Sequence, residues 1–371
     1  MTVVGRAPAG NRRATAAVRG DGPDVLMTVT RLRDNPYPEL WAEAMRAAGA
    51  RLEHLGFRAL VRARRRGRAW VNLQWPEWAL SGNTAQALRR LGTLLALCVM
   101  ARLAGHRILL TVHNVRGHDV RHPLLERVMW WSLGALSTHL HTFTAVGARE
   151  FVGAVPPARS LRPVVIPHGD YGPVVGPAPS REQARAGFGL GPEHRVFLVF
   201  GRLRAYKGLD AVLDAFASGH DPQDRLLVCG APADVRTEAS LKTAAESDPR
   251  VVVVPRFLEQ TELTAALVAA DVVVAPYTRV TNSGSALMAL TLARPIVLPR
   301  TPVFEELAHR VGPGWVHLVD GRLRCEDLAA AADSQARETS APDLTWCSWD
   351  AVTAALAELF AAPEGLGGRH D

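Results

Sequence analysis

Residues 196–208 read VFLVFGRLRAYKG, and this stretch decides the fold class. Its first five residues, all valine, phenylalanine or leucine, predict a buried strand over 196–200. The glycine that follows ends the strand, and from Gly208 onward the apolar residues recur with a helical period. A strand that passes through a short glycine-bearing loop directly into a helix indicates a parallel βαβ unit.

The same alternation of strand and helix extends in both directions. Continuous apolar strands between helices are typical of parallel sheets covered on both faces, so we predict the α/β class. The predicted helices include Glu39–Ala48, Gly208–Phe216, Glu262–Ala269, Ser285–Leu292 and Trp349–Phe360. The predicted strands are Val25–Val29, Trp70–Leu73, Ile108–Val112, Thr142–Ala145, Val164–Ile166, Val196–Phe200, Arg225–Cys229, Val251–Val254, Val272–Ala275 and Pro295–Leu298.

The stretch Pro167–Pro179, rich in proline and glycine, separates two sets of strands and indicates an interdomain linker. We expect a disordered basic tail over 1–22, an N-terminal Rossmann-like domain over 23–167 and a C-terminal one over 168–348. The last helix and a tail occupy 349–371. Ligands of open parallel sheets bind beyond the carboxyl ends of the strands, so functional residues should lie in a cleft between the two domains.

The net charge of +7 is unevenly distributed. Residues 1–165 contain 24 arginines and no lysine against 10 acidic residues, whereas residues 166–371 contain 19 basic and 26 acidic residues. Such asymmetry indicates two domains with different partners, and a basic half suits nucleic acid, a membrane surface or an anionic substrate. Neither zinc-finger spacing nor an RNA-binding aromatic signature occurs, so we expect no nucleic-acid partner.

Two segments, 84–104 and 121–137, combine leucine, methionine and tryptophan with arginines. Basic residues beside an apolar helix face suit an anionic lipid surface, which predicts peripheral membrane contact. The alternative is that both segments are ordinary core helices with solvated arginines. Both interpretations stay open.

The cysteine spacing and the apolar segments bear on the compartment and on metal binding. The four cysteines, at 98, 229, 325 and 347, are far apart and indicate reduced core thiols rather than a zinc site. The longest apolar run, 91–101, is about half the roughly 20 residues that span a membrane. The first 22 residues lack the apolar centre of a signal peptide. We therefore expect a cytoplasmic protein without a metal, peripheral at the inner face of the cell membrane if its acceptor is a lipid.

The loop after the strand at 196–200 has the chemistry of a phosphate site. Gly201 allows close approach to the backbone, Arg202 and Lys207 supply two cations, and the helix N-terminus that follows favours anions. Lys207 and Lys242 are the only lysines among 43 basic residues. The set can hold a diphosphate without a metal and neutralise its charge as it leaves.

A second loop, after the strand at 272–275, offers neutral groups. Asn282, Ser283 and Ser285 can cap the helix that follows, while Gly284 keeps the first backbone amides accessible. Simple capping and an anion cradle are compatible interpretations of this loop.

Loops of the N-terminal half also follow predicted strands. Residues 111–119, TVHNVRGHD, place His113, Asn114, His118 and Asp119 at one sheet edge, which suits recognition of sugar hydroxyls and proton transfer. Two further loops carry Asn35 with Tyr37 and Trp75 with Glu77. Tryptophan at such a place can stack on a sugar, lie against lipid or pack at a strand end.

These motifs resemble those of the GT-B glycosyltransferases, in particular family 4 and related bacterial enzymes that build exopolysaccharides and glycolipids. The resemblance covers roughly residues 25–360 and implies two Rossmann-like domains facing across a cleft, with the last helix returning to the N-terminal domain. GRLRAYKG (201–208) resembles the donor-phosphate motif, which implies that Gly201, Arg202 and Lys207 bind the diphosphate of a nucleotide sugar. TVHN (111–114) resembles the loop whose histidine approaches the donor sugar, which implies His113.

The sequence departs from the family pattern at two positions. Many retaining members carry two glutamates, separated by seven residues, in the last donor loop, where this chain has Val280 and Met288. The stereochemistry therefore stays open. An inverting enzyme needs a base to deprotonate the acceptor hydroxyl, and Asp119 is the first candidate and Glu77 the second.

The sequence thus predicts a metal-independent glycosyltransferase, without a cofactor, that moves a hexosyl unit from a UDP- or GDP-sugar to a hydroxyl acceptor. The acceptor is either lipid-linked or a natural-product precursor. Alternatives are a sugar-nucleotide epimerase and a catalytically inactive module that activates another transferase. The donor contacts expected besides the phosphate loop are Asn282, Ser283, Gly284, Ser285, Phe257 and Leu258, and the acceptor contacts are Asn35, Tyr37, Trp75, Asn114 and His118.

Overall fold

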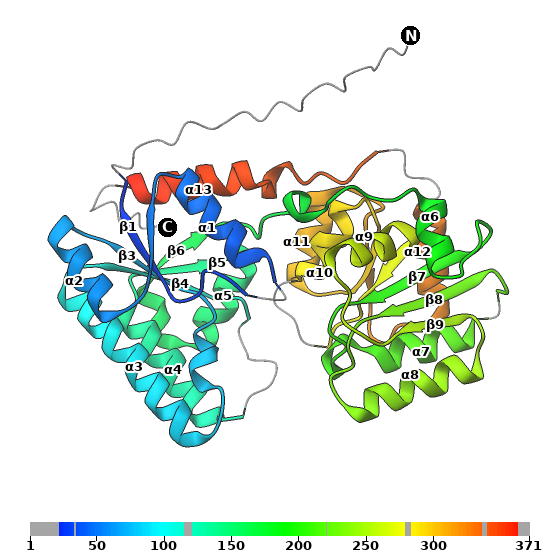
Figure 1. Cartoon of the computed structure of the whole chain (residues 1–371), viewed down its shortest axis with the longest axis horizontal. Helices are drawn as coiled ribbons and strands as arrows, with labels where there is room; N and C mark the ends of the chain where they lie inside the picture. The colour runs from blue at the N-terminus through cyan, green and yellow to red at the C-terminus, as the bar shows by residue number, and fades with distance from the viewer. Residues whose placement is uncertain are drawn as a thin grey trace, which may run out of the picture.

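The computed structural model describes residues 22–32, 35–114, 121–219, 221–278, 283–335 and 340–362. Its frame consists of two six-stranded sheets, one in each half of the chain (Figure 1). The strand orders are β2-β1-β3-β4-β5-β6 and β12-β11-β10-β7-β8-β9, and neighbouring strands are parallel throughout. The predicted α/β class with two Rossmann-like sheets is confirmed.

Helices and strands alternate in the first half as expected of βαβ units. The strands are β1 (Asp24–Met27), β2 (Arg51–His54), β3 (Trp70–Leu73), β4 (Arg107–Thr111), β5 (His139–Thr142) and β6 (Arg162–Val165). The α-helices are α1 (Tyr37–Ala47), α2 (Phe57–Arg66), α3 (Thr84–Leu103), α4 (Pro123–Leu136) and α5 (Ala145–Ala154), joined by the 3-10 turns η1 (Pro76–Leu80) and η2 (Pro156–Ser160).

The second half repeats this plan. Its strands are β7 (Arg195–Phe200), β8 (Asp224–Cys229), β9 (Val251–Val254), β10 (Val272–Val274), β11 (Ile296–Pro299) and β12 (Val316–Val319). Its helices are α6 (Arg181–Gly187), α7 (Leu209–Ser218), α8 (Val235–Ser247), α9 (Gln260–Ala269), α10 (Gly284–Thr291), α11 (Pro302–Val311), α12 (Cys325–Gln335) and α13 (Trp349–Ala361), with 3-10 turns η3 (Gly172–Val174), η4 (Ala205–Lys207) and η5 (Thr345–Cys347).

One predicted strand is wrong in position, and two strands escaped prediction. The strand expected over Thr142–Ala145 lies earlier, over His139–Thr142, because the Thr144 hydroxyl accepts a hydrogen bond from the backbone N–H of Gly147 and starts α5 there. The missed strands, β2 and β12, lie at sheet edges. Each contains polar residues and is incompletely buried, so neither shows the continuous apolar run of a central strand.

The last helix crosses from the second half to the first. Figure 1 shows α13, in red, lying beside α1 above the first sheet. Val352 and Leu356 of α13 are fully buried with Met27 and Trp41, against the core of the first sheet. This part of the fold prediction is confirmed, whereas the domain boundaries at 22/23, 167/168 and 348/349 stay predictions.

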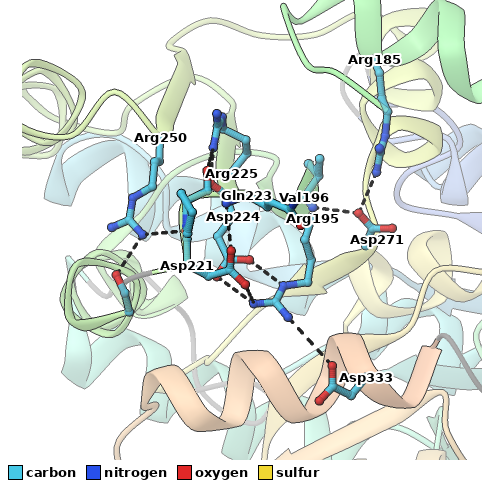
Figure 2. A network of polar contacts seen from close by, with 12 residues as sticks. Arg185, Arg195, Val196, Asp221, Gln223, Asp224, Arg225, Arg250, Asp271 and Asp333 are labelled. Carbon is cyan, nitrogen blue, oxygen red and sulfur yellow. Dashed lines mark hydrogen bonds and ion pairs between the residues drawn. The ribbon is translucent and has the colours of Figure 1, made fainter. Parts of the chain in front are cut away.

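The amino-terminal edge of the second sheet is held by paired charges (Figure 2). The Arg195 guanidinium donates to both Asp224 and Asp221, at 2.6 and 3.1 Å. Asp271 accepts from Arg185 and from the backbone N–H of Val196, at 2.8 and 2.7 Å. These contacts join the starts of neighbouring strands and so stabilise the fold at this edge.

The segments 84–104 and 121–137 form α3 and α4, which pack side by side against the first sheet (Figure 1). Each helix buries one face in the core. Each also exposes large apolar side chains: Leu88, Val99 and Leu103 on α3, and Leu124, Val128 and Trp131 on α4. Core packing accounts for the buried face of each helix, and the membrane contact stays a prediction. Among the described residues, no helix is both long enough and apolar enough to cross a membrane.

Candidate active site

The loop between β7 and α7 is shaped by glycines that no other residue can replace without strain. Gly201 and Gly208 have φ angles of +86° and +71°. A Cβ atom on Gly208 would lie 2.3 Å from the carbonyl oxygen of Pro276, and one on Gly230, after β8, would lie 1.9 Å from that of Gly201. The backbone of this loop therefore packs directly against the two neighbouring strand ends, which leaves it little freedom.

Lys207 lies at the end of this loop with its ammonium group buried. Its Nζ donates to the carbonyl oxygen of Phe200 at 2.8 Å. Burial, and secondly the positive charge of Arg204, lowers the pKa of Lys207 to about 8. The ion pairs found within the described ranges do not include Lys207, while Arg202 is exposed nearby. A buried cation without a carboxylate partner is suited to an anionic ligand.

The loop before α10 presents hydroxyl groups. The Ser283 Oγ accepts from the backbone N–H of Ala286 at 3.0 Å and lies 2.9 Å from the Tyr277 hydroxyl, to which Ser285 also hydrogen-bonds. Asn282 lies outside the described residues. Of the two donor contacts expected after β9, Phe257 is 52% exposed and can meet a ligand, whereas Leu258 is buried in the core.

Gly284 is closely packed against another segment of the chain, which the sequence analysis did not predict. A Cβ atom there would lie 2.5 Å from the hydroxyl oxygen of Tyr171, a residue of the segment that connects the two sheets. The backbone N–H of Tyr171 also donates to the Thr291 hydroxyl at 3.1 Å. The connecting segment is therefore packed onto both ends of α10.

His113 lies among aromatic rings at the end of β4. It stacks on Trp75, with ring centroids 3.7 Å apart, packs edge-to-face with Tyr37 and lies tilted against Phe143. Trp75 adopts φ +43°, a strained conformation for a bulky residue that is typical of functional turns. Burial, followed by the neighbouring His168 and His141, holds the pKa of His113 well below its usual value. The ring is therefore neutral at physiological pH.

The other N-terminal candidates differ in accessibility. Tyr37 has no exposed surface, and no described residue hydrogen-bonds its buried hydroxyl. The Asn35 side-chain oxygen accepts a hydrogen bond from the backbone N–H of Tyr37, the first residue of α1, at 3.0 Å. The Asn114 Oδ1 is buried and has no hydrogen-bond partner among the described residues, so a ligand can satisfy it. His118 and Asp119 lie outside the described residues.

Glu77, in η1, has the properties of a proton acceptor. Its Oε2 is buried and has no hydrogen-bond partner within the part of the chain that the structure describes. Burial, with a smaller contribution from the negative charge of Glu126, raises the pKa of Glu77 to about 7. A carboxyl group with this pKa is present in both protonation states at physiological pH, as acid–base catalysis requires.

Residues of both halves line a pocket between them, and Ser283 is the one predicted site residue among those that line it. Phe143, Thr144 and His168 line one side, and Ser283, Leu287 and Arg310 are among the residues of the other. Lys207, His113 and Glu77 do not line this pocket. The connecting segment beneath it is fixed by Trp349, whose indole N–H donates to the carbonyl oxygen of Asp170 at 2.8 Å. His168, which the sequence placed in a linker, is thus part of the interdomain surface.

Within the described ranges, no group of three or more histidine, cysteine or acidic residues is arranged to hold a metal ion. The four cysteines are free thiols.

Comparisons with known proteins agree with this architecture. A family profile described as "Glycosyl transferases group 1" matches residues 194–335, which contain the Lys207 loop and the Ser283 loop. The GDP-mannose:glycolipid 4-beta-D-mannosyltransferase of Xanthomonas campestris is 30% identical over 285 residues, 76% of each chain.

Solved structures share the fold. HepE from Anabaena, crystallised with UDP and glucose, superimposes with a TM-score of 0.63 at 13% identity, over 91% of this chain and 99% of that one. Sucrose-phosphate synthase from Thermosynechococcus elongatus gives a TM-score of 0.58 at 16% identity, over 91% and 95%. With its paired parallel sheets, its returning helix and these relatives, the chain belongs to the GT-B glycosyltransferases.

Proposed function

We propose that this glycosyltransferase moves a mannosyl unit from GDP-mannose to a hydroxyl group of a lipid-linked acceptor, without a metal ion. The observation that carries the proposal is the buried ammonium of Lys207 at the carboxyl end of β7. The mannosyl donor and the glycolipid acceptor are those named for the Xanthomonas relative.

The donor end of the proposal rests on charge. A nucleoside diphosphate placed against the Lys207 loop offers the buried ammonium the negative charge that it lacks within the described residues. Arg202 adds a second cation, and the Ser283 and Ser285 hydroxyls add neutral donors. Together the two cations can stabilise the leaving diphosphate in the role that a metal ion has in other transferases.

We further propose that the reaction inverts the anomeric carbon. The relative is named as forming a β-mannoside, and a β linkage made from an α-linked sugar nucleotide requires inversion. Inversion in one step needs a base for the acceptor hydroxyl. Asp119 and Glu77 remain the candidates, and the raised pKa of Glu77, about 7, suits this role.

The acceptor is proposed to bind the first half, near Trp75, Asn35, Asn114 and His118, with its lipid at a membrane surface. The exposed apolar side chains of α3 and α4 support a peripheral contact of this kind. Residues 78–118, which contain α3, include five arginines and no acidic residue, which suits anionic headgroups.

The test begins with nucleotide binding, measured as the thermal shift produced by GDP, UDP, ADP and dTDP with and without EDTA. We expect GDP to stabilise the protein most, EDTA to change nothing, and Lys207→Met to abolish the shift. Lys242→Met is the matched control, because Lys242 is exposed beside Glu246 on α8. A shift that requires magnesium, or that persists in Lys207→Met, would overturn the donor site.

Transfer is then measured from GDP-mannose to synthetic alkyl-diphosphate-linked sugars, with the anomeric configuration of the product read by NMR. A β product supports inversion, and an α product contradicts it. Glu77→Gln and Asp119→Asn are compared in the same assay, since only loss of the base lowers kcat by about 100-fold or more. Conversion of the nucleotide sugar without an acceptor would instead indicate an epimerase.

A further inference from the structure

A connected set of polar side chains lies beneath His113, in a part of the core where polar groups are costly to bury. Its members come from α1 and from three adjacent strands or their carboxyl ends. They are Trp41, Asn72, Gln74, Thr111 and His141, and each is buried. The function proposed above assigns no role to this set.

The orientation of Asn72 is fixed by its neighbour Trp41. The indole N–H of Trp41 can only donate, and it lies 3.1 Å from Asn72 Oδ1, which must therefore be the oxygen. The amide nitrogen of Asn72 then points the other way and donates to the Leu109 carbonyl and the Thr111 hydroxyl, at 3.3 and 2.9 Å. A flipped Asn72 would place two donors face to face.

The orientation of Gln74 follows from that of Asn72. Gln74 Nε2 donates to Asn72 Oδ1 at 3.0 Å, and a flipped Gln74 would bring two oxygens together there. Gln74 Oε1 therefore faces His113 Nε2, 2.6 Å away. Because an amide oxygen can only accept, the proton of the His113 ring must be on Nε2. The indole N–H of Trp41 therefore determines the tautomer of His113 through the side-chain amides of Asn72 and Gln74.

A second branch of the set gives an independent check. His141 Nε2 lies 3.0 Å from the Ile166 carbonyl oxygen and must carry a proton, so its Nδ1 accepts. The Thr111 hydroxyl, which accepts from Asn72, is left to donate to that Nδ1 at 3.1 Å. The two branches meet at the Thr111 hydroxyl, which accepts from Asn72 and donates to His141, so the proton positions deduced from Trp41 and from His141 are consistent. His168 has the opposite tautomer, because its Nδ1 donates to the Gly169 carbonyl at 2.8 Å.

We propose that Gln74 is a positioning residue for glycosyl transfer: oriented by Asn72 and Trp41, it keeps the His113 proton on Nε2 and holds the ring against Trp75. The inference rests on the function proposed above for the reaction itself. In this state Nε2 donates to Gln74 and Nδ1 is the acceptor atom of the ring.

The test uses the full-length protein labelled with 15N-histidine, whose ring nitrogens report the tautomer by NMR. His113→Asn identifies the His113 signal. We expect Nε2–H for His113 and His141, and Nδ1–H for His168. In Gln74→Met, which keeps the volume but removes both hydrogen bonds, His113 should become a mixture of tautomers, and kcat should fall roughly 10- to 100-fold with little change in donor KM. Gln86→Met, at the exposed start of α3, is the control.

Several results would overturn the proposal. An Nδ1–H signal for His113 in the wild type does so even if Gln74→Met fails to fold. So does a pure Nε2–H signal in Gln74→Met, or full turnover in a variant whose tautomer has changed. The proposed function fails separately: a wild type that binds no nucleotide and transfers no sugar would leave the NMR result to decide the positioning of the ring.

Discussion

At the scale of the residue, Lys207 shows how burial prepares a side chain for its ligand. Its ammonium is removed from water yet bonded only to a carbonyl oxygen among the described residues, so its positive charge is poorly compensated. Burial consequently lowers its pKa to about 8. A bound anion reverses this effect, because an opposite charge within a few ångströms favours the protonated form.

This predicts that nucleotide binding takes up a proton. Near pH 8 about half of the free protein has neutral Lys207, and a diphosphate raises its pKa, so binding of GDP should add protons and weaken as the pH rises from 7.5 to 9. Calorimetry in buffers of different ionisation enthalpy measures the uptake. Lys207→Arg keeps the charge at all these pH values and should remove the uptake. Equal uptake in that variant would assign the proton to another group.

At the scale of the element, α3 and α4 each have two apolar faces. Positions 87, 91, 94, 98 and 101 of α3 are buried, while Leu88, Val99 and Leu103 recur along another side and are exposed. On α4 the exposed series is Leu124, Val128 and Trp131, with the Arg127 guanidinium over the Trp131 ring. Core packing explains the first face of α3 but leaves the exposed series without a structural reason.

We predict that these exposed side chains bind anionic membranes. The wild type should sediment with phosphatidylcholine vesicles that contain phosphatidylglycerol, and less so in high salt, since arginines contribute. Leu103→Glu with Leu124→Glu, at positions 81% and 78% exposed, should weaken binding about tenfold or more. Val235→Glu, 82% exposed on α8, is the matched control. Unchanged binding by the double variant, or a dimer in sedimentation velocity, would contradict the prediction.

At the scale of the whole molecule, α13 joins the end of the chain to its beginning. The indole N–H of Trp349 donates a hydrogen bond to the Asp170 carbonyl oxygen in the connecting segment. The Trp349 ring also occupies the space that a Cβ on Gly169 would need, with atoms 2.3 Å away. Further along, Val352 and Leu356 are buried against the first sheet. The helix therefore stabilises the first half and fixes the segment that leads to the second.

We predict that Leu356→Ala lowers the free energy of unfolding by about 2–5 kcal/mol, because it leaves a cavity beside Met27 and Trp41. Leu88→Ala, on the exposed side of α3, should change it by less than about 0.5 kcal/mol. Urea unfolding followed by circular dichroism measures both. The thermal shift produced by GDP should survive in Leu356→Ala, since the nucleotide loop belongs to the other half. Equal stability of the two variants would show that α13 is loosely attached.

Much of the fold followed from local pattern. Central strands such as β7 and β10 are continuous apolar runs, and the glycines at 201 and 208 mark the loop that the structure places at a strand end. Two edge strands, β2 and β12, were missed because they are incompletely buried and lack such a run. The misplaced β5 shows that a single capping threonine, Thr144, outweighs a short apolar window.

By itself, the sequence determined the α/β class, the two halves and the loop that carries Lys207, because periodicity, propensity and glycine placement act between near neighbours in the chain. Only the tertiary structure decided that Tyr37 has no exposed surface, that Lys207 has a lowered pKa and that Gln74 faces His113 from 39 residues away. Burial, pKa and tautomer depend on what surrounds a side chain in space. Those surroundings come from strands distant in sequence, which only folding brings together.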